Sequence, residues 1–83
     1  MPVKSLAPGN LVLRYQYALA LAAYDRDSYR DGIATALIRA TADKPQTAYE
    51  VFAQNRARAL LTALKGPDLE AFDRLVRHDQ GYP

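Results

Sequence analysis

Apolar residues recur along four segments of the chain at the three- and four-residue spacing of an amphipathic helix. In the last segment Leu69, Phe72 and Val76 follow this spacing, with acidic residues near its start and basic residues near its end. Short polar breaks that contain proline, glycine or aspartate separate the segments. The sequence therefore predicts an all-α fold, a compact four-helix domain with helices at about residues 11–24, 28–42, 46–65 and 67–78.

Local start and stop signals agree with these boundaries. Thr47 and Glu50 have the spacing of a capping box, in which each side chain bonds to the backbone N–H of the other residue. A Gly-Pro pair directly after residue 65 ends the same helix. Ser28 and Asp31 form a weaker capping-box pattern, which predicts the start of the second helix.

The first predicted helix has large apolar side chains on two sides, and a helix that is apolar all round must be covered all round. Either the other three helices enclose it within one chain, or a second copy or a partner protein covers one side. We favour the second alternative, because three short helices have little surface with which to cover both sides. One side carries Val12, Tyr15 and Leu19, and the other carries Leu13, Tyr17, Leu21 and Tyr24.

The chain has 83 residues, which is enough for one domain and too few for a second core. We expect a single helical domain over residues 1–83, with flexible ends at residues 1–9 and 79–83. As a helix, the apolar stretch from Leu11 to Tyr24 would span about 21 Å, which is short of the roughly 30 Å of a bilayer core. No membrane partner is therefore expected. The absence of cysteine excludes disulfides and, with no signal-peptide pattern, favours a cytoplasmic location.

The chain holds few of the side chains that enzymes use. It has no cysteine, two serines and a single histidine, His78, at the end of a predicted helix. No phosphate-binding glycine loop, dinucleotide fingerprint or zinc-hydrolase motif is present. Asp25, Asp27 and Asp31 lie close together but alternate with arginines and lack the glycine-centred spacing of a calcium loop. We therefore expect no enzymatic activity, no cofactor and no metal site.

The distribution of charge says more than the net charge of +2. Residues 44–66 hold four basic side chains against Glu50, which gives this block a charge of +3. Such a block is the one feature that points to nucleic acid, although its electrostatic footprint is small. The four basic residues are Lys44, Arg56, Arg58 and Lys65.

Arg56 projects from the apolar arc of the third predicted helix, between Tyr49 and Phe52 on the helical wheel. A buried guanidinium without a partner is costly, so it needs a carboxylate, a carbonyl or a route to water. One interpretation is an interface anchor that clamps a carboxylate or phosphate. The other is a structural pair with one of the aspartates, or a stem that packs while its head reaches solvent. The sequence leaves both open.

Two helical families share part of the pattern. The stretch 40–52 resembles a helix-turn-helix, but the small residue and the turn glycine of that family would fall on Arg39 and Asp43. The surroundings of Tyr29 resemble a tetratricopeptide repeat, but the distance along the chain to the matching Leu69 exceeds the length of that repeat. We assign the chain to neither family.

Tyrosine is the dominant aromatic residue, with six copies against two phenylalanines and no tryptophan. Tyrosine and arginine are enriched at protein interfaces. We therefore predict a small non-enzymatic regulator, adaptor or inhibitor that acts by docking on another protein. The alternative is a nucleic-acid-binding regulator that uses the basic third helix, and a third interpretation is a domain that only assembles oligomers. The predicted partner-binding residues are Tyr15, Tyr17, Tyr24, Tyr49, Arg56 and Arg58.

Overall fold

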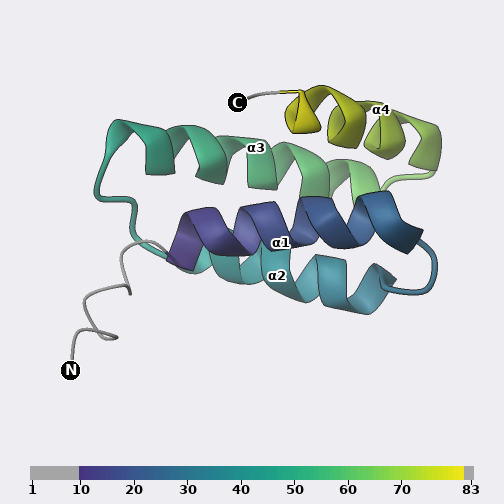
Figure 1. Cartoon of the computed structure of the whole chain (residues 1–83), viewed down its shortest axis with the longest axis horizontal. Coiled ribbons are helices and arrows are strands. Elements are labelled where there is room, and N and C mark those ends of the chain that lie inside the picture. Colours follow the sequence, from purple (N-terminus) through teal and green to yellow (C-terminus); the bar gives the residue numbers. More distant parts are fainter. Residues whose placement is uncertain (1–9, 82–83) are drawn as a thin grey trace.

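The computed structural model describes residues 10–81, and this part of the chain contains four helices and no strand. The predicted all-α four-helix fold is confirmed, and no helix begins or ends more than two residues from its predicted boundary. None of the described helices is long and apolar enough to cross a membrane. The helices are α1 (Asn10–Asp25), α2 (Arg30–Ala42), α3 (Ala48–Lys65) and α4 (Leu69–Gln80) (Figure 1).

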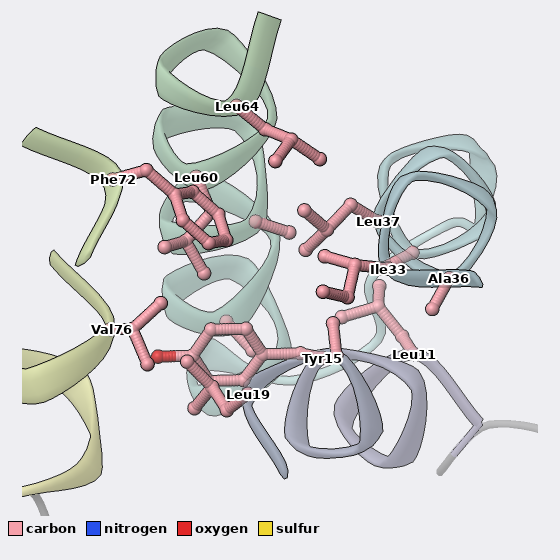
Figure 2. Packing of buried hydrophobic residues seen from close by; sticks show 14 residues of the cluster. Leu11, Tyr15, Leu19, Ile33, Ala36, Leu37, Leu60, Leu64, Phe72 and Val76 are labelled. Atoms are coloured by element: carbon pink, nitrogen blue, oxygen red, sulfur yellow. The ribbon is translucent and has the colours of Figure 1, made fainter. Parts of the chain in front are cut away.

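The helices α1 and α3 run in the same direction through the middle of the molecule, and α2 and α4 run the other way (Figure 1). Viewed along the helices, α2 packs against α1 and α3 on one side, and α4 packs against them on the other (Figure 2). With 12 residues against 18, α4 is shorter than α3 and lies along its C-terminal half (Figure 1). The N-terminal half of α3 therefore extends beyond the end of α4.

The core fills the space between the four helices. Large side chains from every helix meet there, while alanines on α2 and α3 let these two helices approach closely. Figure 2 shows the Tyr15 ring reaching across this core towards Val76 of α4. The largest fully buried side chains are Leu11, Ile33, Leu37, Leu60, Leu64 and Phe72.

The capping box at the start of α3 is present as predicted. Thr47 Oγ1 accepts a hydrogen bond from the Glu50 backbone N–H at 3.1 Å, and Glu50 Oε1 accepts from the Thr47 N–H at 3.0 Å. The same Glu50 oxygen accepts from the backbone N–H of Gln46 at 2.6 Å. These bonds satisfy N–H groups that the first turn of a helix leaves without partners.

The predicted capping box at the start of α2 is wrong. Ser28 instead donates its backbone N–H and its hydroxyl to the Asp25 carboxylate, at 3.2 and 2.7 Å. These bonds hold the pKa of Asp25 below its usual value. The first residue of α2 is Arg30, and the residue before it makes no side-chain cap. Ser28 therefore lies in the turn after α1 and binds back to Asp25, the last residue of that helix.

The end of α2 is satisfied by a side chain from another helix. Gln54 of α3 is buried, and its Nε2 donates to the backbone carbonyls of Ala40, Thr41 and Asp43 at 3.1, 3.2 and 2.6 Å. Carbonyls in the last turn of a helix have no partner within the helix. Gln54 therefore joins the end of α2 to α3.

The helix α4 continues to Gln80, two residues beyond its predicted end. The Asp79 side chain, within the segment 79–83 that we expected to be flexible, is fully buried. Its burial follows from contacts with α1 and α3, which the local sequence does not reveal. Residues 1–9 and 82–83 lie outside the described part of the chain.

Candidate functional site

A buried carboxylate joins three helices. Asp79 of α4 accepts hydrogen bonds from Arg56 Nε at 3.1 and 3.2 Å and from Arg56 Nη2 at 2.5 Å. The Tyr15 hydroxyl of α1 donates to the Oδ2 atom of Asp79 at 2.8 Å. Burial, together with this hydrogen bond, raises the pKa of Tyr15 above its usual value of 10.0. Of the two interpretations of Arg56, the structure therefore shows the structural pair with an aspartate.

The outward side of α1 carries no charged residue over three turns. Leu13, Tyr17 and Tyr24 are 57%, 59% and 79% exposed, more than any other large hydrophobic side chain among the described residues. The small residues Ala20 and Ala23 lie between Tyr17 and Tyr24. The exposed polar residue beside them, Gln16, is uncharged. We call this surface the α1 outer face. It consists of the exposed residues Leu13, Gln16, Tyr17, Ala20, Ala23 and Tyr24.

The two apolar sides of α1 have different environments. Tyr15 and Leu19 are buried, so the chain encloses the side that they share with Val12. On the other side only Leu21 packs against the core, while Leu13 and Tyr17 stay exposed. The single chain therefore does not enclose α1 on both sides. Enclosure of both sides was the alternative that we did not favour.

A groove of about 370 Å³ lies between α1 and α2, next to the α1 outer face. The Tyr17 ring borders this groove on the α1 side, and Gly32 and Thr35 border it on the α2 side. At one end Arg14 forms an ion pair with Asp43 at 2.7 Å. Asp31 and Arg39 of α2 also line the groove.

A second hollow, of about 270 Å³, lies where α4 ends between α1 and α3. Tyr49 and Phe52 stack on its α3 side, with ring centroids 5.9 Å apart. Leu19 and Ala20 border it on the α1 side, and the buried Asp79 carboxylate borders it on the α4 side. Ala20 thus belongs both to this hollow and to the α1 outer face.

The basic residues of the third helix do not gather on one face. Arg56 is paired with Asp79. Arg58 donates to the side-chain oxygens of Asn55 at 3.1 Å and Gln54 at 3.3 Å. Lys44 precedes α3 and Lys65 ends it, so an 18-residue helix, about 27 Å long, separates the two lysines.

The predicted partner-binding residues fall into separate places. Tyr17 and Tyr24 lie on the α1 outer face, and Tyr49 borders the hollow beside α4. Tyr15 and Arg56 support the core through Asp79, and Arg58 lies on the exposed part of α3. Sequence reasoning missed Leu13, Ala20 and the α1–α2 groove as parts of a surface. The signal was available, because the stretch 13–24 holds a single charged residue, Arg14.

Among residues 10–81, no group of three histidine, aspartate or glutamate side chains is placed to hold a metal ion. Comparisons with protein-family models, with curated proteins and with solved structures find no match to this chain.

Proposed function

We propose that this protein is a small non-enzymatic regulator, adaptor or inhibitor that acts by docking on another protein through the α1 outer face. One observation carries the proposal. The six exposed side chains of this face include no charge, although 24% of all residues are charged. The exposed positions of α2, α3 and α4 carry at least two charged residues each, whereas the exposed charge described on α1 is Asp25, its last residue.

Exposed apolar surface is unfavourable in water, and its removal from water is the main driving force of protein association. Tyr17 and Tyr24 suit such a surface, because the ring packs against a partner while the hydroxyl stays near water. Ala20 and Ala23 between them allow a partner backbone to approach closely. The face therefore has the composition of the centre of an interface.

The distribution of charge supports a protein partner over nucleic acid. Nucleic-acid binding needs a cluster of lysines and arginines that faces the phosphates. The α1 outer face has none, and Arg56 is neutralised by Asp79. An uncharged apolar surface instead suits an apolar face of a protein.

The test compares what the intact chain and two variants capture from an extract of the host cell. The double variant Leu13→Ser/Tyr17→Ser removes the large apolar groups from the α1 outer face. Val51→Ser is the matched control, because Val51 is 46% exposed on α3, away from the face. Circular dichroism and thermal unfolding verify that both variants remain folded.

We expect the double variant to lose captured proteins that Val51→Ser retains. Equal capture by the double variant and the control would refute the α1 outer face as the docking surface. Binding of duplex DNA or RNA that weakens steeply as salt rises, with no protein captured, would favour the nucleic-acid alternative.

A further inference from the structure

The α1 outer face is complementary to itself when two copies run antiparallel. Leu13, Tyr17, Ala20 and Tyr24 follow one another at intervals of four, three and four residues, as along the seam of a helix pair. With a two-fold axis between residues 18 and 19, Tyr17 of each copy meets Ala20 of the other. Leu13 of each copy then meets Tyr24 of the other. A parallel pair would instead place Ala20 against Ala20 and leave a gap.

The neighbouring helix α2 carries two charges that suit the same symmetry. Asp31 and Arg39 are exposed, line the α1–α2 groove, and form no ion pair with any described residue. They lie eight residues apart, about 12 Å along the helix, which is too far for them to pair with each other. Their midpoint is Thr35. A two-fold axis at that level sets Asp31 of each copy against Arg39 of the other.

A single two-fold axis fits both the α1 seam and the charge pair of α2. The Cδ1 atom of Leu21 lies 3.5 Å from the position that a Cβ at Gly32 would take, so these two residues lie side by side. The helices α1 and α2 are antiparallel, so moving along one is matched by moving back along the other. Because Leu21 lies opposite Gly32, residues 18 and 19 of α1 lie opposite residues 35 and 34 of α2. The seam of α1 and the charge pair of α2 therefore share the same two-fold axis.

The area is sufficient for a modest dimer. The large exposed side chains of the two helices are Leu13, Tyr17, Tyr24 and Ile38. The three on α1 expose roughly 400 Å² per copy, and the groove residues Asp31, Thr35 and Arg39 of α2 add polar area, so two copies would bury about 1,000 Å², near the lower limit for a specific interface. Such an interface predicts a dimer whose dissociation constant lies in the micromolar range rather than far below it.

We propose that the protein docked on the α1 outer face is a second copy of this chain, with α1 antiparallel to α1 and Asp31 against Arg39. The two α1–α2 hairpins then stack face to face, so that α1 contacts α1 and α2 contacts α2 across the two-fold axis. This inference rests on the proposed function, since it identifies the partner of the same surface.

The test exchanges the two charges between copies. Asp31→Arg places two arginine pairs across the axis, and Arg39→Asp places two aspartate pairs there. When the two variants are mixed, both pairs of a heterodimer join opposite charges again. Light scattering after gel filtration and sedimentation equilibrium measure the dimer, and native mass spectrometry detects the heterodimer.

We expect the unmodified chain to dimerise and each single variant to dimerise at least about tenfold more weakly. The mixture should form a one-to-one heterodimer with an affinity close to that of the unmodified chain. If Asp31 or Arg39 acted through a contact within its own chain, mixing the two variants would not restore dimerisation. Both residues are exposed, but Asp31 lies in the first turn of α2 and Arg39 in its last turn, so each variant should melt at a slightly lower temperature through the dipole of α2. Mixing the variants should restore the dimer and leave this small loss of monomer stability unchanged.

A second variant tests the seam itself. Ala20→Arg keeps a good helix former but places a long charged side chain where Tyr17 of the second copy would pack. We expect this variant to be monomeric, while Val51→Ser stays dimeric. Dimerisation that neither Ala20→Arg nor the charge variants weaken would overturn the inference, because the dimer would then use another face.

The outcomes separate this inference from the proposed function. A monomeric chain whose Leu13→Ser/Tyr17→Ser variant still loses a captured protein would refute the second copy and leave docking by the α1 outer face intact. A monomeric chain whose capture does not change in that variant would refute both.

Discussion

Asp79 in the last turn of α4 binds two guanidinium nitrogens of Arg56 in the middle of α3. Arg56 Nε lies 3.1 Å and Nη2 lies 2.5 Å from Asp79 Oδ1. The Asp79 side chain is fully buried, while that of Arg56 is 25% exposed. The pair therefore lies at the edge of the core, where the Arg56 guanidinium compensates the charge of the buried carboxylate.

Removal of the carboxylate charge is expected to destabilise the fold. Asp79→Asn removes the negative charge that faces the Arg56 guanidinium and should lower the free energy of unfolding by about 2–4 kcal/mol. Urea denaturation followed by circular dichroism measures the change. Glu70→Gln is the matched control, because Glu70 forms an exposed 3.6 Å pair with Arg74. It should cost less than about 0.5 kcal/mol, and equal losses in both variants would contradict the assignment.

The Tyr15 hydroxyl should contribute less than the carboxylate that it binds. Tyr15→Phe keeps the buried ring and removes one donor to Asp79, so we expect a loss of about 1 kcal/mol in the free energy of unfolding. Tyr17→Phe serves as the control, since Tyr17 is 59% exposed. A loss of comparable size in Tyr17→Phe would show that the buried hydrogen bond has no special contribution.

Alkaline pH should destabilise the protein through the same residue. The pKa of Tyr15 is raised above 10.0 in the folded chain, so above that pH the unfolded chain loses a proton that the folded chain retains. The stabilisation is complete below pH 10 and decreases as pH rises further, by at most about 1.4 kcal/mol per pH unit. Urea denaturation at several pH values above 10 measures this slope. In Tyr15→Phe the slope should be shallower, and an unchanged slope would contradict the proposed cause.

The contact between Gln54 and the end of α2 should contribute more to the free energy of unfolding than a single hydrogen bond does. Gln54→Ala removes a buried amide that serves three carbonyls, and we expect a loss of about 2–3 kcal/mol in the free energy of unfolding. Amide hydrogen exchange should also become faster at the end of α2. Thr62→Ala, at an exposed position of the same helix, should leave both measurements nearly unchanged.

One substitution is expected to stabilise the fold. Gly32 lies inside α2, and an added Cβ would meet only Leu21 Cδ1, at an ordinary contact distance of 3.5 Å. Gly32→Ala should therefore raise the free energy of unfolding by about 0.5–1 kcal/mol, because the unfolded chain loses conformational freedom. A higher melting temperature in calorimetry is the expected result. A lower one would show that α2 and Leu21 have no room for the methyl group.

Local signals predicted the helices well and their partners poorly. The capping box of Thr47 and Glu50 lies within four residues of chain, so the start of α3 could be read directly. Ser28 has an aspartate on either side, at 25 and 31, and only the three-dimensional turn decides which one it binds. The distance along the chain matters even more for Asp79, whose partners Arg56 and Tyr15 lie 23 and 64 residues away.

The sequence predicted that one apolar side of the first helix would be exposed, but not which side. The two apolar sides of α1 indicated that one of them would need a cover from elsewhere. Which side stays exposed depends on where α2, α3 and α4 pack, and this is a property of the whole chain. The fate of Arg56 shows the same limit, since its position between Tyr49 and Phe52 was compatible with both an anchor and a structural pair.

The link between Tyr15 and Asp79 has a consequence for the order of folding during synthesis. A ribosome makes α1 first and adds Asp79 only after 64 further residues, so the nascent α1 must wait for the last turn of α4 before its hydroxyl finds a permanent acceptor. During that interval the hairpin of α1 and α2 can assemble, but the polar contact that joins α1, α3 and α4 cannot. The final closure is therefore a late event, made only after nearly the whole four-helix unit has left the exit tunnel.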